Sequence, residues 1–245
     1  MSDVADPFEQ NYARLVGYLG GADDPDDPAD VLAMQMVLHI EKSDPPGRAE
    51  LLVAAARAVA LLCLDHRAGA DGPWAAPMDA WCDARIRKIA RRARGAQWTA
   101  AQEVWGVMAT EGGAQARALV PGRVGDVDKR ITRLQIGGTE IDGELPEAPA
   151  GPGLCLWVDP TLPMSVGKLA AQVGHGSMLA VTLLELTAAR VWYESGCPLS
   201  VCAANEATWA RLCGEVAAER AVAVRDAGFT EIAPGSVTVI AEVIR

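Results

Sequence analysis

Lys168, Gln172 and His175 are polar side chains in an otherwise apolar segment, "PMSVGKLAAQVGHGSMLA", residues 163–180. The hydrophobic periodicity predicts a helix over 165–186. The three side chains follow the spacing i, i+4 and i+7, so they project from one face of that helix, and the apolar positions share a neighbouring face. An imidazole with an ordinary pKa of about 6.5 can change its charge near neutral pH. This face therefore carries groups that can do chemistry.

Lys168 follows Gly167 in the first turn of this helix, where a cation opposes the helix dipole at a cost of about 0.3–1 kcal/mol. The free backbone N–H groups of a first turn favour an anion. We therefore expect Lys168 to be held there for an incoming anion. The alternative is a lysine that reaches to solvent beside a core histidine, and the helix pattern alone favours that alternative.

A second candidate site lies in "VRDAGFTEIAPGSVTVI", residues 224–240. Val222, Val224 and Asp226 share one face of a predicted strand, which puts the carboxylate at the carboxyl end of that strand. Thr230 follows four residues later. Ligand sites in α/β sheets gather at such ends, although an Asp before a Gly is also common in turns.

Together, "MSVGKLAAQVGHG" and "VRDAGFTEIAPGSVTVIAEV" resemble the peptidyl-tRNA hydrolase 2 family, whose motifs run M-x-x-G-K-x-A-A-Q-x-x-H-A and D-A-G-x-T-x-I-x-x-G-[ST]-x-T-V-[LI]. The resemblance covers about residues 153–243, and residues 1–150 resemble at most the extension of some bacterial members. It implies a mixed four-stranded sheet between helices and hydrolysis of the ester that joins a peptide to the 3′ ribose of tRNA. The implied functional residues are Lys168, Gln172, His175, Asp226 and Thr230. No metal and no cofactor is implied.

The chain departs from the family pattern at several positions. Val166 stands where many relatives have a basic residue, and Phe229 stands where Arg is usual. Gly174 and Gly176 flank His175 in place of Ser and Ala. The loss of two basic residues should weaken phosphate contacts near the site, so we expect tRNA binding to depend on a basic segment elsewhere.

Such a segment is "DARIRKIARRARG", because six of the 22 basic residues fall within positions 85–94, although the net charge of the chain is −10. Its hydrophobic spacing favours an amphipathic helix, whereas comparison with the second half of the chain favours a strand, the reading we adopt. Arg87, Lys88, Arg91 and Arg92 are candidate contacts to RNA phosphates. A solvated charged face is the alternative.

The composition excludes several other classes of protein. No apolar stretch approaches the roughly 20 residues of a membrane span. The start "MSDVADPFEQ" lacks the features of a secretory signal, so a cytoplasmic protein is expected. The six cysteines form no CxxC pair and only three histidines exist, so we expect reduced core thiols and no metal site.

We predict four regions along the chain. Residues 1–30, with eight acids and one Arg, form a flexible acidic tail with a short helix around residues 8–19. Residues 31–139 form an α/β domain, the Pro- and Gly-rich residues 140–152 a linker, and residues 153–245 a domain with the order βααβαββ.

The first half matches the second in one respect, because Trp81 and Trp98 lie 111 positions before Trp192 and Trp209. The predicted elements on either side also follow the same order. The first half is therefore a candidate degenerate repeat, and it lacks the polar residues of the second half, so it would be a non-catalytic copy.

The leading hypothesis is a peptidyl-tRNA hydrolase. Asp226, oriented by Thr230, would activate a water, and Lys168 with the helix N-terminus would stabilise an oxyanion or a phosphate. Gln172 and His175 would position the 3′-terminal adenosine, with His175 also a candidate catalytic residue, and Gly167 would bind the substrate. The alternatives are a catalytically silent tRNA-binding or protein-interaction module and a hydrolase of another small ester or amide. Homodimer formation is left open.

Overall fold

Two mixed β-sheets form the framework of the computed structural model, which describes residues 6–18, 23–226 and 232–245. We call the first sheet with its helices the N-terminal unit. Its strands are in the order β2-β1-β4-β3, with β1 and β2 parallel and the other pairs antiparallel. They are β1 (Leu32–His39), β2 (Lys88–Ala93), β3 (Gly106–Glu111) and β4 (Ala114–Leu119), and the short β5 (Gly122–Arg123) also pairs with β1.

The second sheet with its helices is the C-terminal unit. Its order is β7-β6-β9-β8, with β6 and β7 parallel and the other pairs antiparallel. The strands are β6 (Gly153–Val158), β7 (Leu199–Ala203), β8 (Ala221–Arg225) and β9 (Val237–Ile244). This is the mixed four-stranded sheet that the family resemblance implies.

The helices connect these strands in the same way in both units. In the N-terminal unit they are α2 (Arg48–Leu64), α3 (Ala75–Asp83) and α4 (Gly95–Gln102), and in the C-terminal unit α6 (Val166–Leu179), α7 (Leu186–Glu194) and α8 (Glu206–Ala217). Both units thus follow the order βααβαββ, and the four tryptophans of the matched spacing lie on the matching helices α3, α4, α7 and α8. The α/β fold class is confirmed.

The basic segment forms a strand, so the alternative helical interpretation of residues 85–94 is wrong. β2 pairs in parallel with β1 from Lys88 opposite Met34 to Ala93 opposite His39. In a strand, successive side chains point to opposite faces of the sheet, so the basic residues of this segment do not share one surface.

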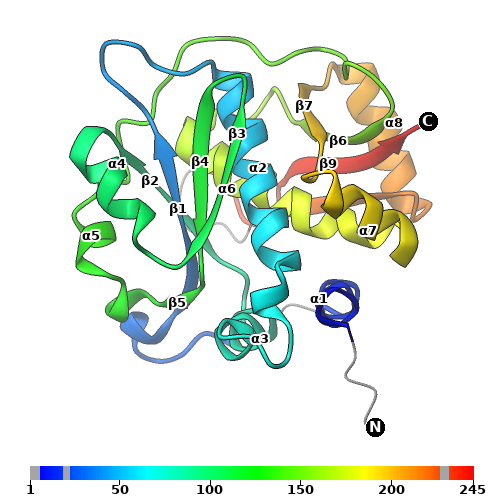
Figure 1. Ribbon diagram of the computed structural model, residues 1–245. Helices are drawn as coiled ribbons and strands as arrows, with labels where there is room; N and C mark the ends of the chain where they lie inside the picture. Colours follow the sequence, from blue (N-terminus) through cyan, green and yellow to red (C-terminus); the bar gives the residue numbers. More distant parts are fainter. Residues whose placement is uncertain (1–5, 19–22, 227–231) are drawn as a thin grey trace, which may run out of the picture.

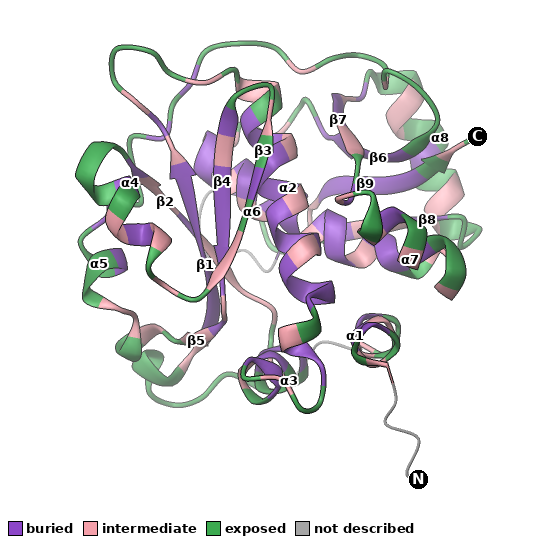
Figure 2. Cartoon of the chain, viewed as in Figure 1, coloured by how far each residue is buried: buried purple, intermediate pink, exposed green. Residues whose placement is uncertain are grey.

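Helices α2 and α6 lie between the two sheets and form the centre of the molecule (Figure 1). Each packs on its own sheet and also on an edge strand of the other unit, α6 on β2 and α2 on β7. The buried residues concentrate in this layer (Figure 2). One apolar cluster includes residues of both units, among them Met34, Met36, Leu154 and Leu156. The two units therefore share a core.

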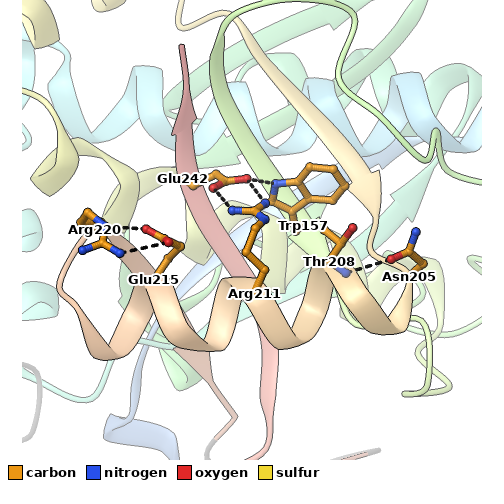
Figure 3. A network of polar contacts seen from close by, with 7 residues as sticks. All are labelled: Trp157, Asn205, Thr208, Arg211, Glu215, Arg220 and Glu242. Atoms are coloured by element: carbon orange, nitrogen blue, oxygen red, sulfur yellow. Dashed lines mark hydrogen bonds and ion pairs between the residues drawn. The ribbon is translucent and has the colours of Figure 1, made fainter.

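The outer faces of the sheets carry smaller cores. Helix α4 and the short α5 (Lys129–Thr132) cover the first sheet, and α8 covers the second (Figure 1). Figure 3 shows how α8 is held: the Glu242 carboxylate of β9 accepts hydrogen bonds from Trp157 Nε1 and from both terminal nitrogens of Arg211, each at 2.8 Å. Because Glu242 is buried, these three bonds compensate its lost hydration.

Helix α1 (Pro7–Val16) is the short helix expected near the N-terminus, and it contacts both units. Phe8 is buried, and its ring centre lies 5.5 Å from that of Tyr193 on α7 at an interplanar angle of 39°, while Asn11 donates to the Asp65 carbonyl after α2. Residues 140–152 form no helix or strand in the structure. The boundaries proposed at residues 30, 139 and 152 stay predictions.

The glycines on either side of His175 let α6 pack tightly on both sides. A Cβ at Gly174 would lie 2.9 Å from Val59 Cγ2 of α2, and one at Gly176 would lie 3.1 Å from Val239 Cγ1 of β9. Val166, at the start of α6, is buried in the shared core. These departures from the family pattern thus coincide with the enclosure of α6 between the two units.

We predict that Gly174→Ala lowers the free energy of unfolding by about 1–3 kcal/mol, because the added methyl group overpacks the contact with α2. Gly214→Ala is the matched control. Gly214 also lies inside a helix, but a Cβ there meets open space, so alanine should stabilise the protein by up to about 1 kcal/mol. Urea denaturation measures both effects. Equal stabilisation by the two substitutions would contradict the tight contact.

Candidate active site

A cavity of about 530 Å³ lies between the two units along one face of α6. One wall is α6, and the opposite wall comes from the start of β2 and the segment 136–140 of the N-terminal unit. The end of β8 closes one side. The lining residues that carry polar functional groups are Arg87, Lys88, Thr139, Glu140, Ser165, Lys168, Gln172, His175, Arg225 and Asp226.

Lys168 and Asp226 form an ion pair in this cavity, between Lys168 Nζ and Asp226 Oδ2. The side chains are 14% and 5% exposed, so the pair is largely shielded from water. It forms because β8 ends beside the first turn of α6. In the structure the anion beside Lys168 is thus a carboxylate of this chain, whereas the sequence predicts an incoming anion.

Gln172 and Thr238 extend this pair into a chain of hydrogen bonds. Thr238 Oγ1 donates to Gln172 Oε1 at 2.7 Å, which turns the amide nitrogen of Gln172 toward Asp226 Oδ2 at 3.5 Å. Thr238 is fully buried on β9. Thr238 is not among the site residues predicted from the sequence, although it stands at the threonine of the T-V pair in the second motif.

The first turn of α6 already has hydrogen-bond acceptors within the chain. Ser165 Oγ accepts from the Lys168 N–H at 3.2 Å, and Thr139 Oγ1 accepts from the Gly167 N–H at 3.0 Å. A Cβ at Gly167 would lie 3.0 Å from Thr139 Oγ1, so the approach of Thr139 favours glycine there. No motif in the sequence points to Thr139.

His175 and Lys88 lie at the other end of the cavity. Burial and the charge of Lys88 hold the pKa of His175 well below its ordinary value, so the imidazole is neutral at physiological pH. The expectation that His175 changes its charge near neutral pH is therefore wrong. The Lys88 amine lies 3.3 Å from Met178 Sδ and 4.9 Å from the centre of the Trp81 ring, and burial lowers its pKa to about 8.

The other basic residues of the segment have different surroundings. Arg91 is on the opposite face of β2, where it donates to Gln35 Oε1 at 2.9 Å and to the Leu134 carbonyl at 3.0 Å, and Arg92 donates to Gln135. Neither lines the cavity. Arg87 does, and its guanidinium pairs with the Asp24 carboxylate. The tRNA contacts proposed for these residues stay predictions.

The structure thus brings together Gly167, Lys168, Gln172, His175 and Asp226 from the C-terminal unit with Arg87 and Lys88 from the N-terminal unit. Thr230 and Phe229 lie outside the described residues. Within the described ranges, no group of three or more His, Cys, Asp or Glu is placed to hold a metal ion. No helix of the described chain is long and apolar enough to cross a membrane.

We predict that Lys88→Met raises the free energy of unfolding at pH 7. Below pH 8 the amine is charged in both the folded and the unfolded protein, so the folded state bears the full cost of its burial. Between the folded pKa of about 8 and the ordinary 10.5 the folded protein releases the proton first, so that cost disappears. The advantage of the variant over the wild type should therefore shrink from pH 8 to pH 10.5 in urea denaturation. An advantage that stays constant with pH would contradict a buried amine.

One protein-family model matches the C-terminal unit. Residues 153–242 match the family model described as "Peptidyl-tRNA hydrolase PTH2". The matched range contains α6, Asp226 and Thr238, and the N-terminal unit lies before it. No curated protein matches the chain. The match supports membership of residues 153–242 in the peptidyl-tRNA hydrolase PTH2 family.

Proposed function

We propose that this chain hydrolyses the ester between a peptide, or an N-blocked aminoacyl group, and the 3′ end of tRNA. The observation that carries the proposal is the Lys168–Asp226 pair in a cavity, oriented through Gln172 and Thr238, inside the range that matches a peptidyl-tRNA hydrolase family.

In this proposal Asp226 is the general base. It takes a proton from a water, whose oxygen attacks the ester carbonyl, and it returns the proton to the ribose oxygen when the tetrahedral intermediate breaks down. Lys168 balances the charge of Asp226 before the reaction. Once Asp226 is protonated, the positive charge of Lys168 is free to stabilise the oxyanion. Asp226 therefore acts as the base when water attacks and as the acid when the ribose oxygen leaves, and Lys168 balances the negative charge in both steps.

The hydrogen bonds around Asp226 favour this role over a purely structural one. The amide of Gln172 approaches one carboxylate oxygen, and Thr238 fixes the amide, so the carboxylate is held in one orientation. The neutral imidazole of His175 is better suited to binding the 3′-terminal adenosine than to acting as the base. The orienting role of Thr230 stays a prediction.

The N-terminal unit fits a non-catalytic copy of the C-terminal one. Helix α2 occupies the place of α6 in its unit, and its Arg57 bonds to the Gly196 carbonyl at 2.9 Å and to Glu111 Oε2 at 2.6 Å. The Arg57 side chain thus joins the two units and has a structural role. Location in the cytoplasm and homodimer formation also stay predictions.

Substitution of the ion pair tests the proposed chemistry. Asp226→Asn removes the base and Lys168→Met removes the cation, so each should lower kcat on N-acetyl-aminoacyl-tRNA by about 100-fold or more. Lys129→Met, at an exposed lysine of the N-terminal unit, is the control and should keep the wild-type rate. Wild-type rates in both site variants would refute the assignment. Binding of tRNA without hydrolysis by the wild type would favour the silent module instead.

The pairing of Arg87 with Asp24 gives a test of the RNA contact. We expect Arg87→Gln to weaken tRNA binding and to reduce the slope of log K against log salt by about 1. Asp24→Asn should strengthen binding at low salt, because it removes a carboxylate that competes with phosphate for Arg87.

Arg94→Gln is the control for these two variants, since Arg94 is an exposed residue of the same segment that does not line the cavity. It should bind tRNA like the wild type. Filter binding over a salt series measures all three variants. An unchanged affinity of Arg87→Gln for tRNA would show that this part of the segment is a solvated charged face and not an RNA contact.

A further inference from the structure

The N-terminal unit supplies a wall of the cavity that the family match does not include. Ile86 just before β2, Ile89 in β2 and Ile136 in the segment after α5 line the cavity together with Ala171 of α6. Ile136 is 57% exposed, which is high for a large apolar side chain. Apolar walls with a few polar groups at one end are typical of pockets that take a flat organic ring.

The contact between α2 and β7 is the counterpart of the contact between α6 and β2, and it is closed by an arginine. There α2 takes the part of α6, and β7 takes the part of β2. Arg57 spans that contact, from Thr110 and Glu111 of β3 to the Gly196 carbonyl just before β7. At the contact between α6 and β2 the bridging side chain is Lys88 of β2, whose amine reaches only the sulfur of Met178 on α6, so the two matching places in the fold differ.

Lys88 is the polar group that the N-terminal unit places at the inner end of the cavity. In the described part of the chain its amine contacts the sulfur of Met178 and the ring of Trp81, and none of its contacts there is a carboxylate. The nearest titratable groups, the Cys63 and Cys82 thiols and His175, are all uncharged at neutral pH because burial shifts each pKa toward the neutral form. A buried amine without an anion needs an acceptor, which a ligand can provide.

We propose that the N-terminal unit completes the active site as a pocket for the 3′-terminal adenine, in which Lys88 donates to a ring nitrogen and His175 accepts from the exocyclic amino group. This inference rests on the proposed function. Adenine presents an acceptor beside a donor, which matches an amine beside a neutral imidazole. Hypoxanthine, the base of inosine, has an oxygen in place of the amino group and does not match.

The dimensions agree with this assignment. Lys168 and His175 are seven residues apart on α6, which corresponds to about 10 Å along the helix. The ester would lie at the Lys168–Asp226 end and the base at the His175–Lys88 end, with the ribose between them beside Ala171 and Gln172.

Matched minimal substrates test the base pocket in the full-length protein. We expect the wild type to hydrolyse N-acetyl-aminoacyl-adenosine with kcat/KM about 10-fold or more above that for the inosine ester. Lys88→Met should lose this preference through a higher KM for the adenosine ester, with kcat little changed and the inosine ester unaffected. Lys42→Met, an exposed lysine of the same unit, should keep the preference.

The preference for adenosine is the decisive result. A wild type without it, or a Lys88→Met protein that retains it, would overturn the proposal. Thermal unfolding of Lys88→Met accompanies the assay, and because this variant is expected to be at least as stable as the wild type, a lost preference would not reflect unfolding.

Calorimetric binding of adenosine and inosine separates the base pocket from the chemistry. If the wild type hydrolyses no ester, the proposed function fails. Tighter binding of adenosine than of inosine by the wild type, lost in Lys88→Met, would still support the base pocket. Equal binding of the two nucleosides, or no binding of either, would refute it.

Discussion

The contact between α2 and α6 holds in place the helix that carries the first site motif. Helix α6 carries Lys168, Gln172 and His175, and it is packed on its own sheet on one side and on α2 and β2 on the other. Ser177 Oγ donates to the Ala56 carbonyl of α2 at 2.7 Å, and Gly174 allows the close approach of Val59. Because both sides are packed, α6 cannot rotate or shift without loss of core contacts. The face that remains free of packing lines the cavity.

The two lysines of the cavity differ in what balances their charge. Lys168 has an internal partner in Asp226, so its charge is compensated until a proton moves. Lys88 has neutral neighbours, which makes its burial costly for stability. Residues that lower stability are often found where they contact a ligand. The compensated Lys168 end of the cavity is therefore suited to chemistry, and the uncompensated Lys88 end is suited to ligand recognition.

The sequence predicts the elements well and their mutual contacts poorly. Period-2 and period-3.6 patterns locate the strands and helices of residues 153–245, and the motif spacing locates Lys168 and Asp226. The pairing of these two residues is not predicted, because periodicity says nothing of which strand end meets which helix. Thr139 and Lys88 come from the other unit, and only the packing of β2 on α6 brings them to the cavity. Lys88 and Arg91 point to opposite faces because side chains alternate along a strand. The same segment also has the hydrophobic spacing of a helix, so the sequence alone does not predict these orientations.

The most direct test is a single turnover of N-acetyl-aminoacyl-tRNA by the wild-type protein in water labelled with heavy oxygen. General-base catalysis by Asp226 predicts one labelled oxygen in the carboxylate of the released N-acetyl-amino acid, no label in the protein, and no turnover in Asp226→Asn. Label in the Asp226 carboxylate would show that this residue attacks the ester itself. That result, or a wild type that leaves the substrate intact, would contradict the account.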